Sequence, residues 1–202
     1  MSKPKILQEG TSYSFRSYFE LPNDTDEILA EFGYKFERQR LHLPKTTREI
    51  EYLSELQQQL EDTIPYVTLS SETAKREILI APVLARVAVM CRRLLRIEYP
   101  FKVNEQLQGN LDYFIESEMG LIVIEAKRDD LTRGFTQLAV ELIALAMLQE
   151  SPQVLYGVVT IGELWVFGKL ERSTLTIIRD IGSYTLPDDL RELVKILGGI
   201  LE

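Results

Sequence analysis

The chain has 202 residues, of which 45% are hydrophobic and 27% charged, and its net charge is −8. These values are ordinary for a soluble globular protein, and no apolar run approaches the ~20 residues that a membrane-spanning helix needs. The acidic balance argues against unspecific, charge-driven binding of nucleic acid. The single cysteine, Cys91, excludes an internal disulfide and favours a cytoplasmic protein.

Residues 1–66 are predicted to form an N-terminal α+β extension, a strand pair plus an amphipathic helix. The pattern predicts, in order, a strand at 11–21, a short helix at 26–32, a strand at 34–43 and a helix at 48–64. The apolar residues of this last helix form one narrow stripe of Ile50, Leu53, Leu56 and Leu60. A stripe of this kind either supports a core or binds a partner.

Residues 67–202 are predicted to form the main domain, which begins after Pro65 with a long helix over 72–97. Pro82 is expected to kink or divide this helix, because it has no backbone N–H. Its predicted inward stripe is Ile80, Leu84, Val87, Cys91 and Leu94, with Glu77 one turn earlier. Its outer side carries Arg86, Arg92, Arg93 and Arg96, which either contact phosphates or form a solvated face.

The stretch 109–127 predicts a β-hairpin in which two apolar segments are joined by a polar link with Gly120 at the turn. A helix rich in apolar residues follows at 134–150, with Gln137 in its first turns. Three more strands and a last helix after Pro187 complete the chain. This order predicts an α/β sandwich around a mixed sheet.

Three polar side chains interrupt the apolar hairpin, namely Asp112 in the first strand and Glu125 and Lys127 in the second. Glu125 and Lys127 are two apart, so they project to the same face, and strand pairing can bring Asp112 within their reach. Two carboxylates on an apolar sheet repel each other unless a cation lies between them, and oxygen ligands of this kind suit Mg²⁺. An ammonium beside the metal could orient or activate a water.

The pattern of Gly109, Asp112, then Glu125-Ala126-Lys127 and Gln137 resembles the PD-(D/E)XK nuclease superfamily, whose members have a restriction-endonuclease-like fold. The resemblance covers about residues 67–180. The residue before Asp112 is Leu111, where the family's name has proline. The fold it implies is a restriction-endonuclease-like mixed β-sheet sandwiched by helices.

By this resemblance the protein is a Mg²⁺-dependent (or Mn²⁺-dependent) nuclease acting on nucleic acid, with DNA as the first expectation, alone or as a homodimer. Asp112 and Glu125 would bind the metal, with the backbone carbonyl of Ala126. Lys127 would position or deprotonate the attacking water, and Gln137 would hold water, phosphate or Lys127. The resemblance also implies a glutamate from the first helix, for which Glu77 and Glu72 are the candidates; each also reads as a surface residue.

The chain has few of the residues that other kinds of catalytic or metal site require. His42 is the only histidine, so histidine-based triads and zinc sites are not expected, and no Gly-rich phosphate-binding loop is present. Cys91 and Trp165 are interpreted as core residues. The alternatives to a nuclease are a non-catalytic nucleic-acid or protein interaction module on the same fold, or a surface salt bridge between Glu125 and Lys127 on an unrelated sheet.

Overall fold

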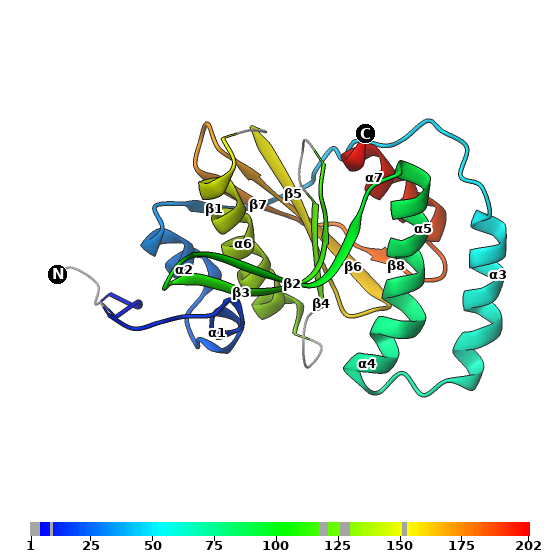
Figure 1. The fold of residues 1–202 in the computed structure, drawn as a ribbon, viewed down its shortest axis with the longest axis horizontal. Helices are drawn as coiled ribbons and strands as arrows, with labels where there is room; N and C mark the ends of the chain where they lie inside the picture. Colours follow the sequence, from blue (N-terminus) through cyan, green and yellow to red (C-terminus); the bar gives the residue numbers. More distant parts are fainter. Residues whose placement is uncertain (1–4, 9, 118–120, 126–129, 151–152) are drawn as a thin grey trace.

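A mixed β-sheet runs through the middle of the protein, between two layers of helices (Figure 1). The computed structural model describes residues 5–8, 10–117, 121–125, 130–150 and 153–202. The helices are α1 (Phe15–Glu20), α2 (Thr25–Glu31), α3 (Leu53–Thr63), η1 (Ile64–Tyr66), α4 (Glu72–Lys75), η2 (Arg76–Ile80), α5 (Ala81–Cys91), α6 (Leu131–Leu148) and α7 (Leu190–Leu201). The strands are β1 (Lys35–Gln39), β2 (Leu95–Asn104), β3 (Leu107–Ile115), β4 (Leu121–Glu125), β5 (Val154–Thr160), β6 (Leu164–Glu171), β7 (Thr176–Asp180) and β8 (Tyr184–Thr185).

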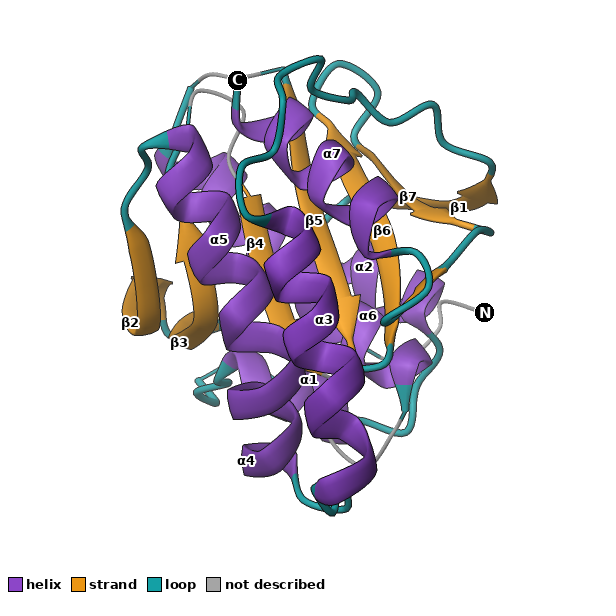
Figure 2. Cartoon of the chain, turned by 90° about the vertical axis from the view of Figure 1, so that its right-hand side faces the viewer, coloured by secondary structure: helices purple, strands orange, loops and turns teal. Residues whose placement is uncertain are grey.

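The strand order in the sheet is β1-β7-β6-β5-β4-β3-β2, and β8 pairs with β6. The β1–β7 and β4–β5 pairs are parallel, and the other pairs are antiparallel. Helices α1, α2 and α6 cover one face of the sheet, while α3, α5 and α7 cover the other (Figure 2). The predicted α/β architecture with a mixed sheet between helices is therefore confirmed.

Residues 1–66 contribute to this same sheet and to both helical layers. Strand β1 pairs in parallel with β7, which places it at one edge of the sheet. Helices α1 and α2 pack against α6, and the predicted leucine stripe of α3 is buried in the opposite layer. Residues on both sides of the predicted boundary between 66 and 67 thus belong to one sheet and to the same two hydrophobic layers.

The predicted strand at 11–21 is wrong, because residues 15–20 form helix α1. The aromatic side chains Phe15, Tyr18 and Phe19 follow helical spacing and are all buried. Ser14 and Ser17 close the start of the helix with a reciprocal capping box. Partial alternation of aromatic and polar residues predicts a strand here. The aromatic residues are in fact spaced i, i+3, i+4, which buries one side of a helix against α6.

The predicted helix over 72–97 is too long, because α5 ends at Cys91. Arg92 adopts a left-handed conformation (φ 53°), and its N–H and that of Arg93 close the last turn onto carbonyls of α5. The chain then enters β2 at Leu95. Just before Pro82 the helix contains a π-helical turn, η2, so its regular α-helical geometry is interrupted next to this proline, where a kink or a division is predicted.

Among the described helices, α6 is the one that is long and apolar enough to cross a membrane by composition alone. In this fold most of it is buried, with side chains in contact with the sheet and with α1 and α2. Asp130 caps the start of α6, since its carboxylate accepts hydrogen bonds from the backbone N–H groups of Thr132 and Arg133.

Packing between α6 and the sheet predicts a strong effect of Gly168→Ala. A Cβ atom at Gly168 would lie 2.5 Å from Cε2 of Phe135 and 3.2 Å from the carbonyl oxygen of Ile178. Phe135 is fully buried, so its ring cannot move aside without cost. We expect the substitution to lower the free energy of unfolding by about 1–3 kcal/mol in urea denaturation. Ser173→Ala, at an exposed turn, is the control and should change it by less than about 0.5 kcal/mol.

Candidate functional site

The structure forms the predicted hairpin and buries two of the predicted site residues beside it. Strands β3 and β4 are antiparallel neighbours, with Tyr113 opposite Val123. Asp112 in β3 is 8% exposed, and Gln137 in α6 is 7% exposed. Both polar side chains therefore lie in a largely apolar interior, where each needs a specific partner.

The second half of the predicted metal site is described only through its backbone. Glu125 is the last residue of β4 and is in register with Thr160 of β5. Ala126 and Lys127, predicted to bind the metal and to position water, lie outside the described residues. Their roles, and the ligand role of the Glu125 side chain, stay predictions.

At Asp112, strand β3 departs from the regular alternation of its side chains between the two faces of the sheet. Leu111 belongs to the hydrophobic layer of α6, whereas Tyr113, two residues later, belongs to the layer of α5 and α7. In a regular strand these two side chains would share a face. The adjacent strand is distorted at the same level, where Glu98 has a left-handed φ of 50°. The break places Asp112 where groups from both helical layers influence it.

Glu141 of α6 is the most unusual group near Asp112. Its side chain is completely buried, and its Oε1 accepts a hydrogen bond of 3.0 Å from Nε2 of Gln137, one helical turn away. Its Oε2 atom is also buried and has no hydrogen-bond partner among the residues that the structure describes. A buried carboxyl oxygen without a partner is costly, which indicates that a water, a proton or a cation belongs beside it.

The surroundings of Glu141 oppose its negative charge. Burial raises the pKa of the Glu141 carboxyl well above its usual range, and the nearby negative charge of Asp112 raises it further. The hydrogen bond from Gln137 acts in the opposite direction on this pKa but is outweighed. Two acidic groups and an amide thus converge on one buried region, where a divalent cation would remove the electrostatic penalty.

Arg76, the first residue of the π-helical turn, approaches the same break from the other layer. It donates hydrogen bonds to the Tyr113 hydroxyl (3.3 Å) and to Oε1 of Glu98 (2.6 Å), and its guanidinium lies 5.1 Å from the centre of the Tyr113 ring. Burial lowers the pKa of Arg76, but these hydrogen bonds and the charge of Asp112 raise it more, so the net shift is upward. Arg76 therefore brings a permanent positive charge to this region.

The structure places Glu77 and Glu72 at exposed positions, Glu72 in α4 and Glu77 in η2. The inward stripe predicted for this helix holds for Ile80, Leu84 and Val87, which are buried. Glu77 does not continue the stripe inward, because the π-helical turn changes the angular spacing between it and the residues of α5. The glutamate of the first helix is thus solvent-facing, whereas the buried carboxyl comes from α6.

The three arginines predicted to contact nucleic acid do not share one helix. Arg92 ends α5 and Arg93 follows it, both exposed, while Arg96 lies in β2. The guanidinium of Arg96 stacks 4.9 Å from the Tyr99 ring centre and pairs with Glu116 at 3.4 Å. The predicted continuous basic helix face is therefore wrong, because the helix ends before Arg96.

A metal ion suits the donor set in this region. Within the described ranges, no group of three or more acidic, histidine or cysteine side chains is close enough to form a complete metal site. Asp112 and Glu141 nevertheless offer carboxylate oxygens, one of them buried and without a partner, which fits the preference of Mg²⁺ or Mn²⁺ for hard ligands. Glu125, predicted from the sequence, would supply a further carboxylate.

Comparison of the chain with protein-family models and with curated proteins gives no match. The function is therefore inferred from the residues and their arrangement. Two groups of the site, Glu141 and Arg76, were not among the sequence-based candidates. Glu141 carried a recognisable signal, since it is an acidic residue on the wide apolar face of its helix, four residues after Gln137. Arg76 carried none, because its role depends on the strand break.

Proposed function

We propose that this protein is a metal-dependent nuclease that hydrolyses phosphodiester bonds, with DNA as its substrate, on a restriction-endonuclease-like fold. The observation that carries the proposal is the buried group of Asp112, Gln137 and Glu141 at the break in the central hairpin. Acidic side chains are buried at this density mainly where a cation or a reaction requires them. The order of hairpin, helix and further strands supports the same reading.

In this proposal, Asp112 and Glu125 would hold Mg²⁺, together with the backbone carbonyl of Ala126. The bound ion supplies Lewis-acid stabilisation of the phosphate charge and lowers the pKa of a water. Lys127 positions that water or accepts its proton. Gln137, whose side-chain amide is oriented by its hydrogen bond to Glu141, holds the water or a phosphate oxygen.

Arg76 steadies the site from the opposite layer. Its hydrogen bonds to Tyr113 and Glu98 hold the distorted strand pair on both sides of Asp112. Its positive charge partly offsets the negative charge of Asp112. Arg76 is therefore a positioning residue in this mechanism, acting through the strand break rather than on the substrate.

A non-catalytic nucleic-acid or protein interaction module on the same fold is the second candidate. The observations that favour it are the net charge of −8 and the exposed positions of Glu72 and Glu77, which leave the first helix without an inward carboxylate. In that case the buried acidic group would serve only packing. The two candidates differ in whether a divalent cation binds at Asp112.

The test is cleavage of supercoiled plasmid and of short single-stranded and duplex oligonucleotides with Mg²⁺ or Mn²⁺. We expect nicked or linear products with either ion and none when EDTA replaces it. Calorimetry with Mn²⁺ measures ion binding in parallel. Absence of both cleavage and ion binding would contradict the nuclease and leave the interaction module.

A further inference from the structure

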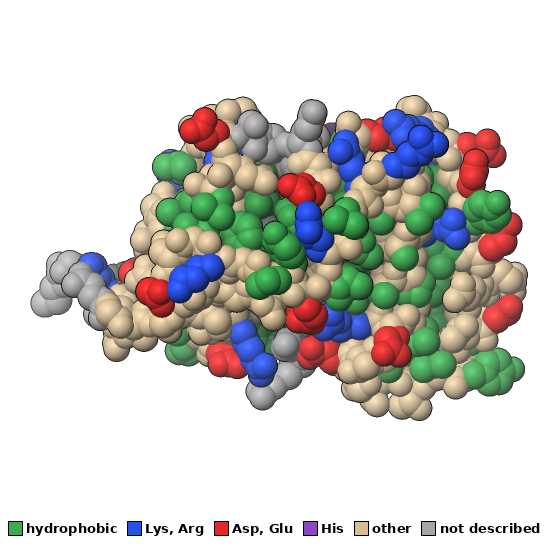
Figure 3. Space-filling view, viewed as in Figure 1, with side chains coloured by type: hydrophobic (Ala, Val, Ile, Leu, Met, Phe, Trp, Pro, Cys, Tyr) green, Lys and Arg blue, Asp and Glu red, His purple; other side chains and the backbone are tan. Residues whose placement is uncertain are grey.

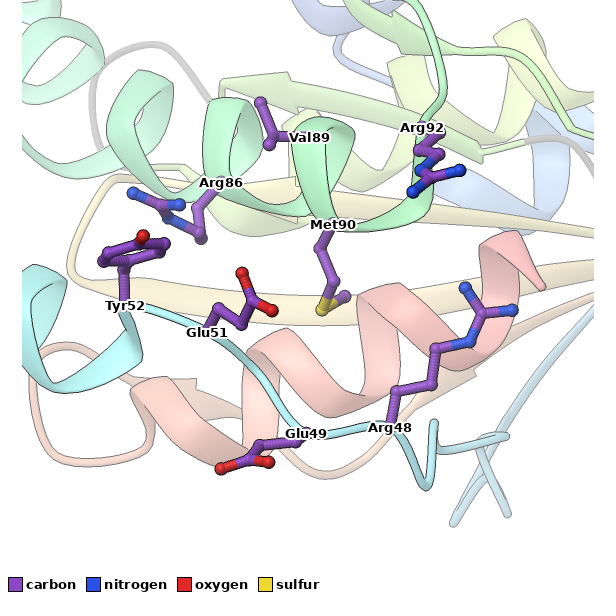
Figure 4. A pocket seen from close by; sticks show the side chains of 8 residues that line it. All are labelled: Arg48, Glu49, Glu51, Tyr52, Arg86, Val89, Met90 and Arg92. Carbon is purple, nitrogen blue, oxygen red and sulfur yellow. The ribbon is translucent and has the colours of Figure 1, made fainter.

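A second feature of the surface is an elongated pocket of about 330 Å³ between α5 and the segment that precedes α3 (Figure 4). Arg86, Val89, Met90 and Arg92 line it from α5 and its end, and Arg48 and Tyr52 line it from the other side. Arg86 and Tyr52 lie at one end, and Arg92 and Arg48 lie toward the other. The pocket shares no residue with the buried acidic group.

Among the residues that the structure describes, Arg86 of α5 and Arg92 at its end have no acidic partner. The buried Nε of Arg86 also has no hydrogen-bond acceptor among these residues. Arg48 differs, since it pairs with Glu202 at 2.9 Å. A partly buried guanidinium without an acceptor is a favourable place for an anion.

An aromatic ring accompanies this charge. The guanidinium of Arg86 lies 5.2 Å from the centre of the Tyr52 ring, and Figure 4 shows it over that ring. Tyr52 is nevertheless 59% exposed and Val89 is 69% exposed, so the pocket presents apolar surface beside the positive charge. Tyr52 also has a left-handed φ of 59°, the conformation in which its ring faces α5 just before helix α3 begins.

Two glutamates also line the pocket, with different orientations. The carboxylate of Glu49 points away from α5, whereas that of Glu51 points toward α5, between the two ends (Figure 4). The middle of the pocket is therefore unfavourable for an anion, and its ends are favourable. Arg86 and Arg92 are six residues apart, which corresponds to about 9 Å along a helix. This spacing suits a ligand whose negative charges are separated.

We infer that this pocket binds a short segment of single-stranded nucleic acid, with phosphates at the Arg86 and Arg92 ends and a base against Tyr52. The inference rests on the substrate class of the proposed function and extends it to a binding surface on α5 outside the acidic group. Glu51 can accept hydrogen bonds from base amino groups between the two phosphates. Lys and Arg side chains gather over the carboxyl end of α5, where the strand would continue (Figure 3).

A single strand fits better than a duplex for two reasons. Unpaired bases can stack on an exposed aromatic ring, whereas the faces of paired bases are covered by their neighbours. The pocket is also small, with a volume of about 330 Å³, near the lower limit of about 300–1,000 Å³ for ligand sites. A short stretch of one strand can enter a space of this size, and a double helix cannot.

The experiment measures fluorescence anisotropy of a labelled oligodeoxycytidylate, whose bases carry an amino group, in EDTA, where no metal-dependent cleavage occurs. We expect Arg86→Gln and Arg92→Asn each to weaken binding about tenfold and to reduce the salt dependence by about one phosphate contact. Asparagine is chosen at 92 because it tolerates the left-handed conformation of this residue. Tyr52→Leu should weaken binding about five- to tenfold through lost stacking. Circular dichroism checks that each variant folds.

Arg191→Gln is the control, because Arg191 is exposed on α7 and does not line the pocket. Its affinity should change less than twofold. An equal loss in this control, no binding by the wild type, tighter binding of a duplex, or displacement of the probe by polyglutamate as effectively as by unlabelled strand would each overturn the inference. Because binding is measured in EDTA, it does not depend on cleavage, so a failure of the nuclease proposal and a failure of the pocket give different results.

Discussion

Asp112→Asn is expected to reduce the rate of phosphodiester cleavage by on the order of 10³-fold, which corresponds to about 4 kcal/mol of transition-state stabilisation. The substitution keeps the size of a side chain that is 8% exposed but removes the negative charge that would hold the cation. We also expect weaker Mn²⁺ binding in calorimetry. Single-turnover cleavage of an end-labelled oligonucleotide measures the rate, so product release does not obscure the chemistry.

The matched control for this substitution is Asp188→Asn. Asp188 is exposed in the turn before α7, far along the chain from the hairpin, and its substitution should change neither cleavage nor ion binding. Lys127→Ala separates the two roles in the site: cleavage should fall by a similar factor while Mn²⁺ still binds. If Asp112→Asn cleaves at the wild-type rate, Asp112 is not a metal ligand and the proposed mechanism fails.

Glu141→Gln is expected to stabilise the metal-free protein at neutral pH by about 1–3 kcal/mol. The folded state raises the pKa of this carboxyl through burial and the charge of Asp112, so the folded protein binds the proton more tightly than the unfolded chain does. Stability therefore falls as the pH rises from the usual carboxyl value of 4.5 toward the raised pKa of the folded state. Glutamine does not titrate and avoids this loss.

The measurement is the free energy of urea unfolding across this pH range in EDTA. The wild type and Glu141→Gln should agree at acid pH and diverge as the pH rises, with the variant more stable. Glu163→Gln, at an exposed position, should follow the wild type. Mg²⁺ should then stabilise the wild type more than the variant, because it compensates the Glu141 charge. Parallel pH profiles for the wild type and Glu141→Gln would show that folding does not raise the pKa of the Glu141 carboxyl.

Cleavage should also respond to Glu141→Gln, by about 10–100-fold, the size expected for a group that orients a neighbour of the metal. The hydrogen bond between Glu141 and Gln137 is the reason, because a glutamine at 141 offers the Gln137 amide a different set of partners. A loss confined to the rate, with unchanged substrate affinity, would support this positioning role. A loss of affinity alone would assign Glu141 to substrate binding.

Several parts of the fold could be predicted because their signals are local. The hairpin at 109–127 follows from two apolar runs around a polar link, and β3 and β4 form it. The leucine stripe of α3 and the wide apolar face of α6 follow from helical spacing, and both are buried. Strand β1 was also expected from alternation. In each case the side chains that face the core repeat with the period of the element.

The errors arose where the backbone departs from that period. Arg92 ends α5 in a left-handed conformation that is uncommon for an arginine, so the helix was predicted to continue through Arg96. The π-helical turn rotates Glu77 away from the stripe of α5. The aromatic residues of α1 fit both a strand and a helix over so short a stretch, and only contact with α6 distinguishes the two.

The sequence by itself determined the class of fold and pointed to two polar residues of the proposed site that are buried, Asp112 and Gln137, because polar residues inside apolar elements are visible without coordinates. Only the tertiary structure decided which groups meet Asp112. Glu141 of α6 and Arg76 of η2 interact electrostatically with Asp112, and Glu98 of β2 binds Arg76. These groups come together because β2 and β3 change faces at one level. Such a change depends on packing between layers far apart in the chain, and no local pattern records it.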